Sequence, residues 1–191
     1  MLFNSLQFII FFPVMLLLYH LLSHRWQNRQ LLVASYIFYA TWDARFLFLI
    51  IGSTIVDFYC ARYIARSNDP RIRKGLLLLS ISVNGGALLF FKYFNFFVSS
   101  ATNLLDWIGL PASSHVLQIV LPVGISFYTF QTMCYTIDVY RGRLKPATSL
   151  LDYALYISYF PQLVAGPIER ATNLLPQILN PRSVTPDACF E

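Results

Sequence analysis

Charged side chains are scarce in this chain of 191 residues. Asp, Glu, Lys and Arg together make up 12% of the sequence, and 57% of the residues are hydrophobic. Soluble domains carry about a quarter charged residues, so water is not the main solvent of this chain. The mean hydropathy of +0.55 favours a protein that lies in a lipid bilayer.

Cysteines are also few. The three of them, Cys60, Cys134 and Cys189, are an odd number without CxxC spacing, and the first two fall inside apolar runs. This pattern argues against a disulfide framework and against a zinc site. We therefore expect no bound metal ion.

The motifs of soluble enzymes are missing from the sequence. It contains no Ser-His-Asp arrangement, GxSxG elbow, P-loop or HExxH pair. The histidines do not suggest a site, because His20 ends the first run, His24 lies in the loop after it and His115 lies on the opposite side, so they are predicted at a surface or a membrane interface. The net charge of +5 does not predict a nucleic-acid partner, because apolar runs separate the basic residues.

The chain has instead a series of apolar runs. A helical crossing needs roughly 20 apolar residues, so the length allows about five or six crossings and no large soluble domain. The first run lacks a basic n-region and a cleavage site, so we interpret it as a retained span. We predict an all-α, multi-spanning membrane protein with one domain over residues 1–191. Its runs cover residues 6–22, 31–42, 46–63, 75–98, 116–140 and 150–164.

Some of these runs are irregular. Residues 31–42 form a helix of only about 18 Å, too short for a bilayer core of roughly 30 Å, which suggests a partly re-entrant segment. Residues 99–114 are polar but include Leu104, Trp107, Ile108 and Leu110, which predicts an element lying on the surface. Pro161 interrupts the last run.

The basic residues are unevenly distributed among the loops. The loops after the first, third and fifth runs hold ten of the 14 Lys and Arg residues, and the other two loops hold only Arg45. Because basic loops stay in the cytoplasm, this places the N-terminus outside, and it supports counting the short second run as a crossing. The ten residues are Arg25, Arg29, Arg62, Arg66, Arg71, Arg73, Lys74, Arg141, Arg143 and Lys145.

Three polar residues, Asp57, Asn84 and Gln131, fall near the middle of apolar runs. A charge at this depth costs about 2.5–3.5 kcal/mol, so Asp57 should be neutral, hydrogen-bonded or facing water. The three side chains could line one polar interior. Two interpretations stay open: interhelical hydrogen bonds worth about 0.6–2 kcal/mol each, or a substrate path. Lys92 lies nearer the outer interface, which its stem can reach by snorkelling.

Four stretches of sequence, spread over most of the chain, resemble the bacterial membrane-bound O-acyltransferases. The longest is LPVGISFYTFQ at 121–131, which continues through YTIDVYRG at 135–142. The others are YFPQLVAGPIER at 159–170, ASYIFYA at 34–40 and FFKYFNFF at 90–97. The likeness is to the members that O-acetylate an exported polysaccharide such as alginate.

The resemblance implies a ring of membrane helices around a central channel in the bacterial inner membrane. An acyl thioester, acetyl-CoA or an acyl carrier protein, would approach from the cytoplasm, and a polysaccharide hydroxyl from the other side. A periplasmic acyltransferase partner is implied as well, and no bound cofactor. The candidate channel residues are Tyr128, Gln131, Asp138, Gln162, Asp57 and Asn84.

The catalytic base of the family is an intramembrane histidine far beyond the block at 159–170. The chain ends at residue 191, before that position, and none of its three histidines matches it. We therefore predict that this chain is the N-terminal portion of an acyltransferase, that it contains no catalytic residue and that it is inactive alone. Two alternatives stay open: a transporter or channel, suggested by Asp57, Asn84 and Gln131, and a noncatalytic membrane scaffold.

Overall fold

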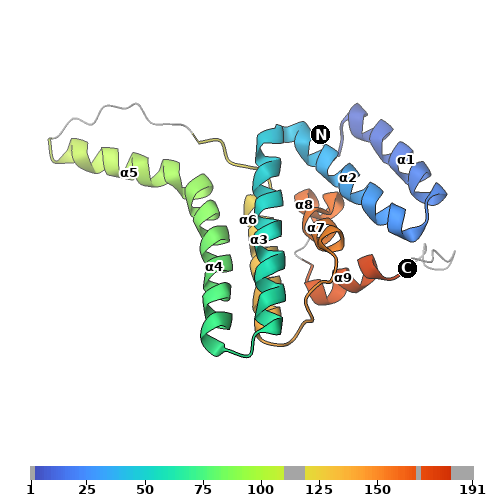
Figure 1. Cartoon of the computed structure of the whole chain (residues 1–191). Coiled ribbons are helices and arrows are strands. Elements are labelled where there is room, and N and C mark those ends of the chain that lie inside the picture. Colours follow the sequence, from blue (N-terminus) through green and yellow to red (C-terminus); the bar gives the residue numbers. More distant parts are fainter. Residues whose placement is uncertain (1–2, 110–118, 167–168, 182–191) are drawn as a thin grey trace.

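The computed structural model describes residues 3–109, 119–166 and 169–181 (Figure 1). Their secondary structure is helical, without a β-strand in these ranges, as the all-α prediction requires. The α-helices are α1 (Leu6–Leu21), α2 (His24–Asp43), α3 (Leu47–Arg66), α4 (Pro70–Leu88), α5 (Phe94–Trp107), α6 (Ile125–Tyr140), α7 (Leu150–Ser158), α8 (Phe160–Ala165) and α9 (Ala171–Leu179).

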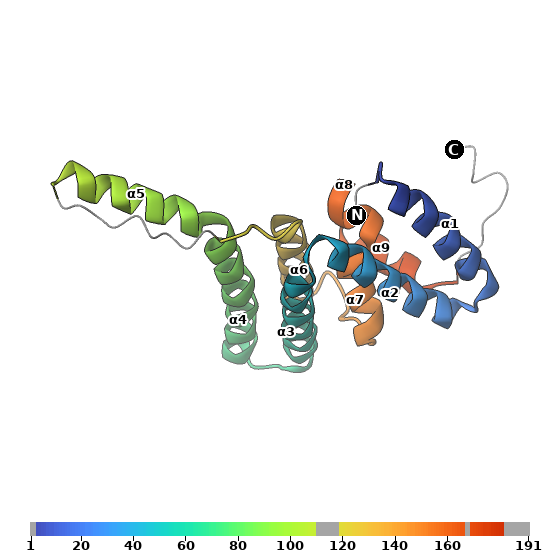
Figure 2. The ribbon, with the colours of Figure 1, turned by 90° about the horizontal axis from the view of Figure 1, so that it is seen from above.

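The centre of the structure is a unit of three packed helices, α3, α4 and α6 (Figures 1 and 2). The reversal from α3 to α4 needs only three residues, because Asp69 caps α4 and Pro70 occupies its first position. The Asp69 carboxylate accepts a hydrogen bond of 2.8 Å from the Arg71 backbone N–H, which satisfies one of the open donors of the helix start.

The remaining helices pack beside this unit. Helices α1 and α2 form an antiparallel pair, and α7, α8 and α9 lie between this pair and α3 (Figures 1 and 2). Aromatic rings fill the contact between α2 and α8, where Phe38 and Phe160 have ring centroids 5.4 Å apart. Both rings are buried, so this contact joins the helix pair to the C-terminal segment.

Two continuous helical stretches in the described ranges, His24–Arg66 and Pro70–Trp107, are long and apolar enough to cross a membrane, and α1 is apolar but shorter. They support a helical membrane protein, while five or six crossings remain a prediction. Both stretches bend. A 3₁₀ turn at Ala44–Phe46 redirects the chain between α2 and α3, and a π-helix at Leu89–Tyr93 redirects it between α4 and α5.

These bends change several predicted boundaries. The run at 31–42 is the second half of α2, because the polar residues from His24 onward are helical too. The run at 75–98 is divided by the π-helix, and α5 turns away from the three-helix unit (Figures 1 and 2). In the run at 116–140 the helix begins only at Ile125, after Pro122 and Gly124, and residues 110–118 lie outside the described ranges. Pro161 lies in the first turn of α8 and separates it from α7, as predicted.

Candidate functional site

Asp57 is completely buried on α3, where it faces α4. Its carboxylate accepts a hydrogen bond of 2.5 Å from Ser80 Oγ and hydrogen bonds of 2.8 and 3.0 Å from Asn84 Nδ2. The prediction that Asp57 turns towards the protein interior is therefore confirmed. Among the described residues it has no ion-pair partner, so hydrogen bonds alone compensate for its burial.

Helix α6 completes this polar group. Thr132 Oγ1 donates to Asn84 Oδ1 at 3.2 Å, and Ser80 Oγ lies 3.3 Å from Thr136 Oγ1. All five side chains are at most 1% exposed. We call Asp57, Ser80, Asn84, Thr132 and Thr136 the Asp57 cluster. It joins the three central helices through polar side chains that satisfy one another.

The spacing of the Asp57 cluster follows the helical period. Ser80 and Asn84 are four residues apart on α4, and Thr132 and Thr136 are four apart on α6, so each pair lies on one face of its helix. The sequence pointed to Asp57 and Asn84 as mid-membrane polar residues, but the three hydroxyl residues were missed. Pairs of small polar residues at i and i+4 inside apolar runs were the signal that would have revealed them.

Gln131 does not join the Asp57 cluster. It precedes Thr132 on α6, and one residue turns the helix by about 100°, so its side chain faces a different neighbour. Its Nε2 donates to the backbone carbonyl of Tyr156 on α7 at 3.0 Å. Its Oε1 is buried and has no hydrogen-bond partner within the described ranges. The three mid-depth residues thus lie in two different environments.

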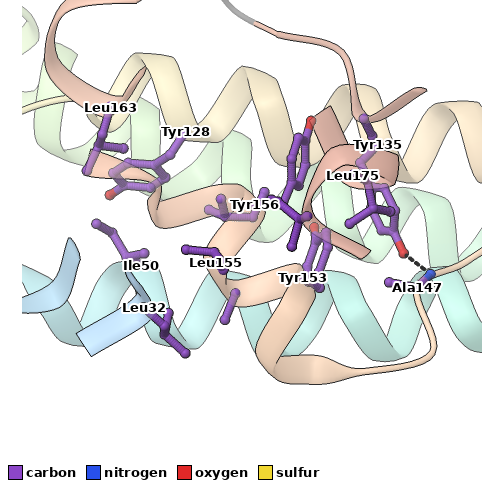
Figure 3. Packing of buried hydrophobic residues seen from close by; sticks show 14 of the residues in the cluster. Leu32, Ile50, Tyr128, Tyr135, Ala147, Tyr153, Leu155, Tyr156, Leu163 and Leu175 are labelled. Carbon is purple, nitrogen blue, oxygen red and sulfur yellow. Dashed lines mark hydrogen bonds between the residues drawn. The ribbon is translucent and has the colours of Figure 1, made fainter. Parts of the chain in front are cut away.

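Tyr128 lies between Gln131 and Thr132 around the axis of α6, since it is three residues from the first and four from the second. Its ring is 2% exposed, and Figure 3 shows it beside Leu163, with its side chain directed towards Ile50. The Tyr128 hydroxyl is buried and lacks a hydrogen-bond partner among the residues that the structure places. Buried polar groups without a partner are rare in proteins, and each calls for an explanation.

The four sequence blocks that suggested the family meet in space. Gly124 has a φ of 73°, and a Cβ atom at this position would lie 3.1 Å from the backbone oxygen of Leu163. Only glycine combines this backbone conformation with so close a contact. The block at 121–131 therefore packs directly on the block at 159–170.

The other two blocks make hydrogen bonds to the same region. Tyr39 Oη donates to the Val123 carbonyl at 3.0 Å, and Ser35 Oγ accepts from the Phe160 backbone N–H at 3.2 Å. The block at 90–97 joins through its Lys92, whose Nζ lies 3.3 Å from the hydroxyl oxygen of Ser126. We call this convergence, from 34–40, 90–97, 121–131 and 159–170, the motif junction.

Three buried tyrosines fill the space between α6 and α7 (Figure 3). The rings of Tyr135 and Tyr153 have centroids 4.4 Å apart, and Tyr156 stands 6.1 Å from Tyr153. Tyr135 Oη accepts a hydrogen bond of 2.9 Å from the Ala147 backbone N–H, which fixes the segment after α6. These rings hold α7 in the position where its Tyr156 carbonyl reaches Gln131.

The remaining candidates lie elsewhere. Asp138 is partly exposed near the end of α6. Gln162 is 7% exposed on α8, in the block that meets Gly124, and its Cα would lie 3.0 Å from a Cβ on Gly166. The six predicted site residues therefore do not form one group. Two belong to the Asp57 cluster, three lie on α6 outside this cluster, and Gln162 lies on α8.

No described histidine or cysteine belongs to the Asp57 cluster or to the motif junction. Within the ranges that the structure covers, no three His, Cys, Asp or Glu residues are grouped so that they could hold a metal ion. His24 Nε2 lies 3.2 Å from the Leu179 carbonyl, His20 stacks edge-on against Tyr19, and His115 is outside the described residues. Cys60 and Cys134 are free thiols, and Cys189 is not described.

Comparison with known proteins relates the whole chain to curated O-acetylases. It is 39% identical over 193 residues to "Probable alginate O-acetylase AlgI" of Pseudomonas aeruginosa and 38% identical to the protein of that name from Azotobacter vinelandii, with all of this chain covered in both. It is 34% identical over 209 residues to "Peptidoglycan O-acetyltransferase" of Helicobacter pylori, which covers 93% of this chain. The chain spans 37–38% of the length of these relatives. No family model and no solved structure matches it.

Proposed function

The chain belongs to the membrane-bound O-acyltransferase family, and we propose that it supplies the N-terminal helices of an enzyme that O-acetylates an exported polysaccharide. The observation that carries this proposal is the similarity along the whole chain to relatives named for O-acetylation. The motif junction supports it, because the blocks that define the resemblance also contact one another. Because the chain spans about 37% of these relatives, the activity of the whole protein belongs to the proposal.

The proposed reaction moves an acetyl group from a thioester to a hydroxyl. The hydroxyl oxygen attacks the thioester carbonyl carbon while a general base removes the hydroxyl proton. The C–S bond then breaks, and the leaving sulfur takes up this proton and departs as the thiol. Loss of general-base catalysis typically costs about 10²–10⁴-fold in rate. The described residues of this chain offer no histidine placed for this step. We therefore assign to this chain the positioning of substrates and not the proton transfer.

The polar side chains of α6 suggest how this positioning is divided. The face with Thr132 and Thr136 is satisfied within the Asp57 cluster, so its role in the proposal is to hold α3, α4 and α6 together. Tyr128 and Gln131, by contrast, each have a buried oxygen atom without a partner in the described ranges. These atoms are available to a ligand or a water molecule, and we assign the substrate path to these two side chains.

The membrane topology in this proposal follows the basic residues. Arg73 Nη2 donates to the Tyr140 carbonyl at 2.7 Å, so the basic segments at 62–74 and 141–145 lie at the same end of the three-helix unit (Figure 1). Because basic segments favour the cytoplasm, this end would face the thioester donor. The opposite side of the bacterial inner membrane would then hold the N-terminus, the polysaccharide and a periplasmic acyltransferase partner, and residues 1–191 would form one multi-spanning domain.

A chimera tests the proposal. This chain would replace the matching segment of the Pseudomonas aeruginosa relative, and the acetyl content of secreted alginate would be measured. We expect the chimera to restore acetylation in a strain that lacks the relative. A chimera that is present in the membrane at normal amounts but leaves alginate unacetylated would contradict the proposal.

A second experiment tests whether residues 1–191 position the substrates without catalysing the transfer. Membranes that contain only residues 1–191 would receive a labelled acetyl thioester and the acceptor polysaccharide. We expect no transfer of label above that of empty membranes, while membranes with the active chimera transfer it. Equal transfer by both would place a catalytic group within this chain.

A further inference from the structure

A groove of about 540 Å³ runs between α1 and α2, and none of the Asp57 cluster lines it. Its walls are apolar side chains at helical spacing, including Ile10, Val14 and Leu18 on α1 and Val33 and Ile37 on α2. Each of these five side chains is between 46% and 60% exposed, so the groove is open along its length. Nothing within the described chain covers it.

One end of the groove is chemically different from the rest. Arg29 lines it there, and its guanidinium carbon lies 4.6 Å from the centre of the Trp26 ring. This cation–π contact orients a side chain that is otherwise exposed to solvent. Arg25 stands one helical turn before Arg29 and adds a second positive charge. No acidic side chain lines the groove in the part of the chain that the structure describes.

The length of the groove matches one leaflet of a bilayer. From Ile10 to Leu22 the chain advances about 18 Å as a helix, and half of a hydrocarbon core of roughly 30 Å is about 15 Å. An apolar channel of this length with a cation at one end is complementary to a lipid whose acyl chain lies in the channel and whose phosphate meets the cation.

We propose that the α1–α2 groove is a binding site for one anionic phospholipid, with an acyl chain between the helices and the phosphate at Arg29. The positive charge of Arg29 at the end of the groove selects an anionic headgroup over a zwitterionic one. A basic residue near a membrane surface is worth about 1 kcal/mol towards anionic lipid, which corresponds to about a fivefold preference. This site does not depend on acetyl transfer, so it can fail or succeed independently of the proposed function.

Fluorescence quenching by brominated lipids tests the site. The chain with Trp42→Phe and Trp107→Phe keeps Trp26 as its one tryptophan, since the sequence has three. It would be reconstituted in vesicles of equal parts phosphatidylglycerol and phosphatidylcholine, with bromine on the acyl chains of one lipid or the other. We expect brominated phosphatidylglycerol to quench Trp26 about fivefold more effectively than brominated phosphatidylcholine.

Two variants distinguish lipid binding at this groove from a general attraction between basic residues and anionic lipid. Arg29→Gln is expected to lower the preference for phosphatidylglycerol about fivefold, because it removes the cation that lines the groove. Arg66→Gln, at the exposed end of α3, is the matched control and should leave the preference unchanged. Equal quenching in the parent chain would overturn the proposal. Weak quenching by both lipids would also overturn it, because it would mean that protein and not lipid fills the groove.

Discussion

At the scale of single residues, Asp57 shows how this protein keeps a carboxyl group in an apolar environment. The Ser80 hydroxyl and the Asn84 amide donate to it from α4, and both donors are themselves buried. A substitution that removes the carboxylate therefore changes more than one interaction. It removes the acceptor of three hydrogen bonds and leaves Ser80 Oγ with Thr136 Oγ1 and Asn84 Nδ2 with the Ser80 carbonyl as their remaining neighbours.

We predict that Asp57→Leu destabilises the chain by about 1–3 kcal/mol for each donor that loses its acceptor. Asp57→Asn should cost less, because its amide oxygen can still accept one of the two hydrogen bonds. Thermal unfolding of the detergent-purified chain, followed by circular dichroism, measures both effects. Cys134→Ser, on the exposed side of α6, is the control. A Leu variant as stable as the parent would show that the Asp57 cluster does not hold the three helices together.

Tyr128 is predicted to behave in the opposite way. Its buried hydroxyl has no partner among the described residues, so Tyr128→Phe removes an unsatisfied group and should stabilise the chain by about 1 kcal/mol. If the hydroxyl contacts substrate, the same change lowers acetylation by the chimera. Unfolding temperature and alginate acetylation are the two measurements. Unchanged acetylation would remove Tyr128 from the substrate path, and a loss of stability would show that the hydroxyl has a structural partner.

At the scale of elements, the approach of the segment before α6 to α8 depends on one glycine. Gly124 has a positive φ and lies against the Leu163 carbonyl. Gly142 has a similar φ of 71°, but no atom lies within 4 Å of the position that its Cβ atom would take. The two positions therefore share the conformational requirement and differ in packing. They form a matched pair for measuring what the contact between the two sequence blocks contributes.

We predict that Gly142→Ala costs about 1–2 kcal/mol, the penalty of the left-handed conformation alone. Gly124→Ala should cost more than this, because its methyl group also displaces the Leu163 backbone. The difference between the two unfolding free energies, from denaturant titration of the purified chain, reports the packing contribution. Equal losses for the two variants would mean that the Leu163 backbone can be displaced at the motif junction without lowering the free energy of unfolding.

At the scale of the whole molecule, the arrangement of charge predicts an orientation in the membrane. The hydrogen bond from Arg73 to Tyr140 brings two basic segments to one end of the three-helix unit, and the exposed polar residues of α5, without any Lys or Arg, follow the opposite end of α4. This asymmetry is a property of the folded chain, since the segments at 62–74 and 141–145 are far apart in sequence.

We predict that Ser67→Cys is protected in intact cells from a membrane-impermeant maleimide and that Ser99→Cys is labelled. Both would be made in a background with the three native cysteines changed to serine. Ser67 lies in the basic connection before α4, and Ser99 lies on exposed α5. Labelling of both positions after membrane disruption is the control for reactivity. The reverse pattern in intact cells would invert the topology.

The composition and the order of the residues along the chain were enough to predict several properties of this protein. Scarce charge and long apolar runs predicted helices in a membrane, and the four sequence blocks predicted the family. The orientation given by the basic loops stays a prediction. The depth of Asp57 and Asn84 along their runs also predicted that Asp57 needs hydrogen bonds and an interior position. Each of these follows from neighbours along the chain, which a sequence displays directly.

Which side chains meet, by contrast, depends on the tertiary structure. Gln131 and Thr132 are adjacent in sequence, yet the rotation of α6 by about 100° per residue directs one to the Tyr156 carbonyl and the other to Asn84. The contact of Gly124 with Leu163 depends on α8, far along the chain, and the bend between α4 and α5 depends on a π-helix without a proline in it. Such pairings are set by how helices rotate and pack against one another, and hydropathy along the chain does not record that rotation.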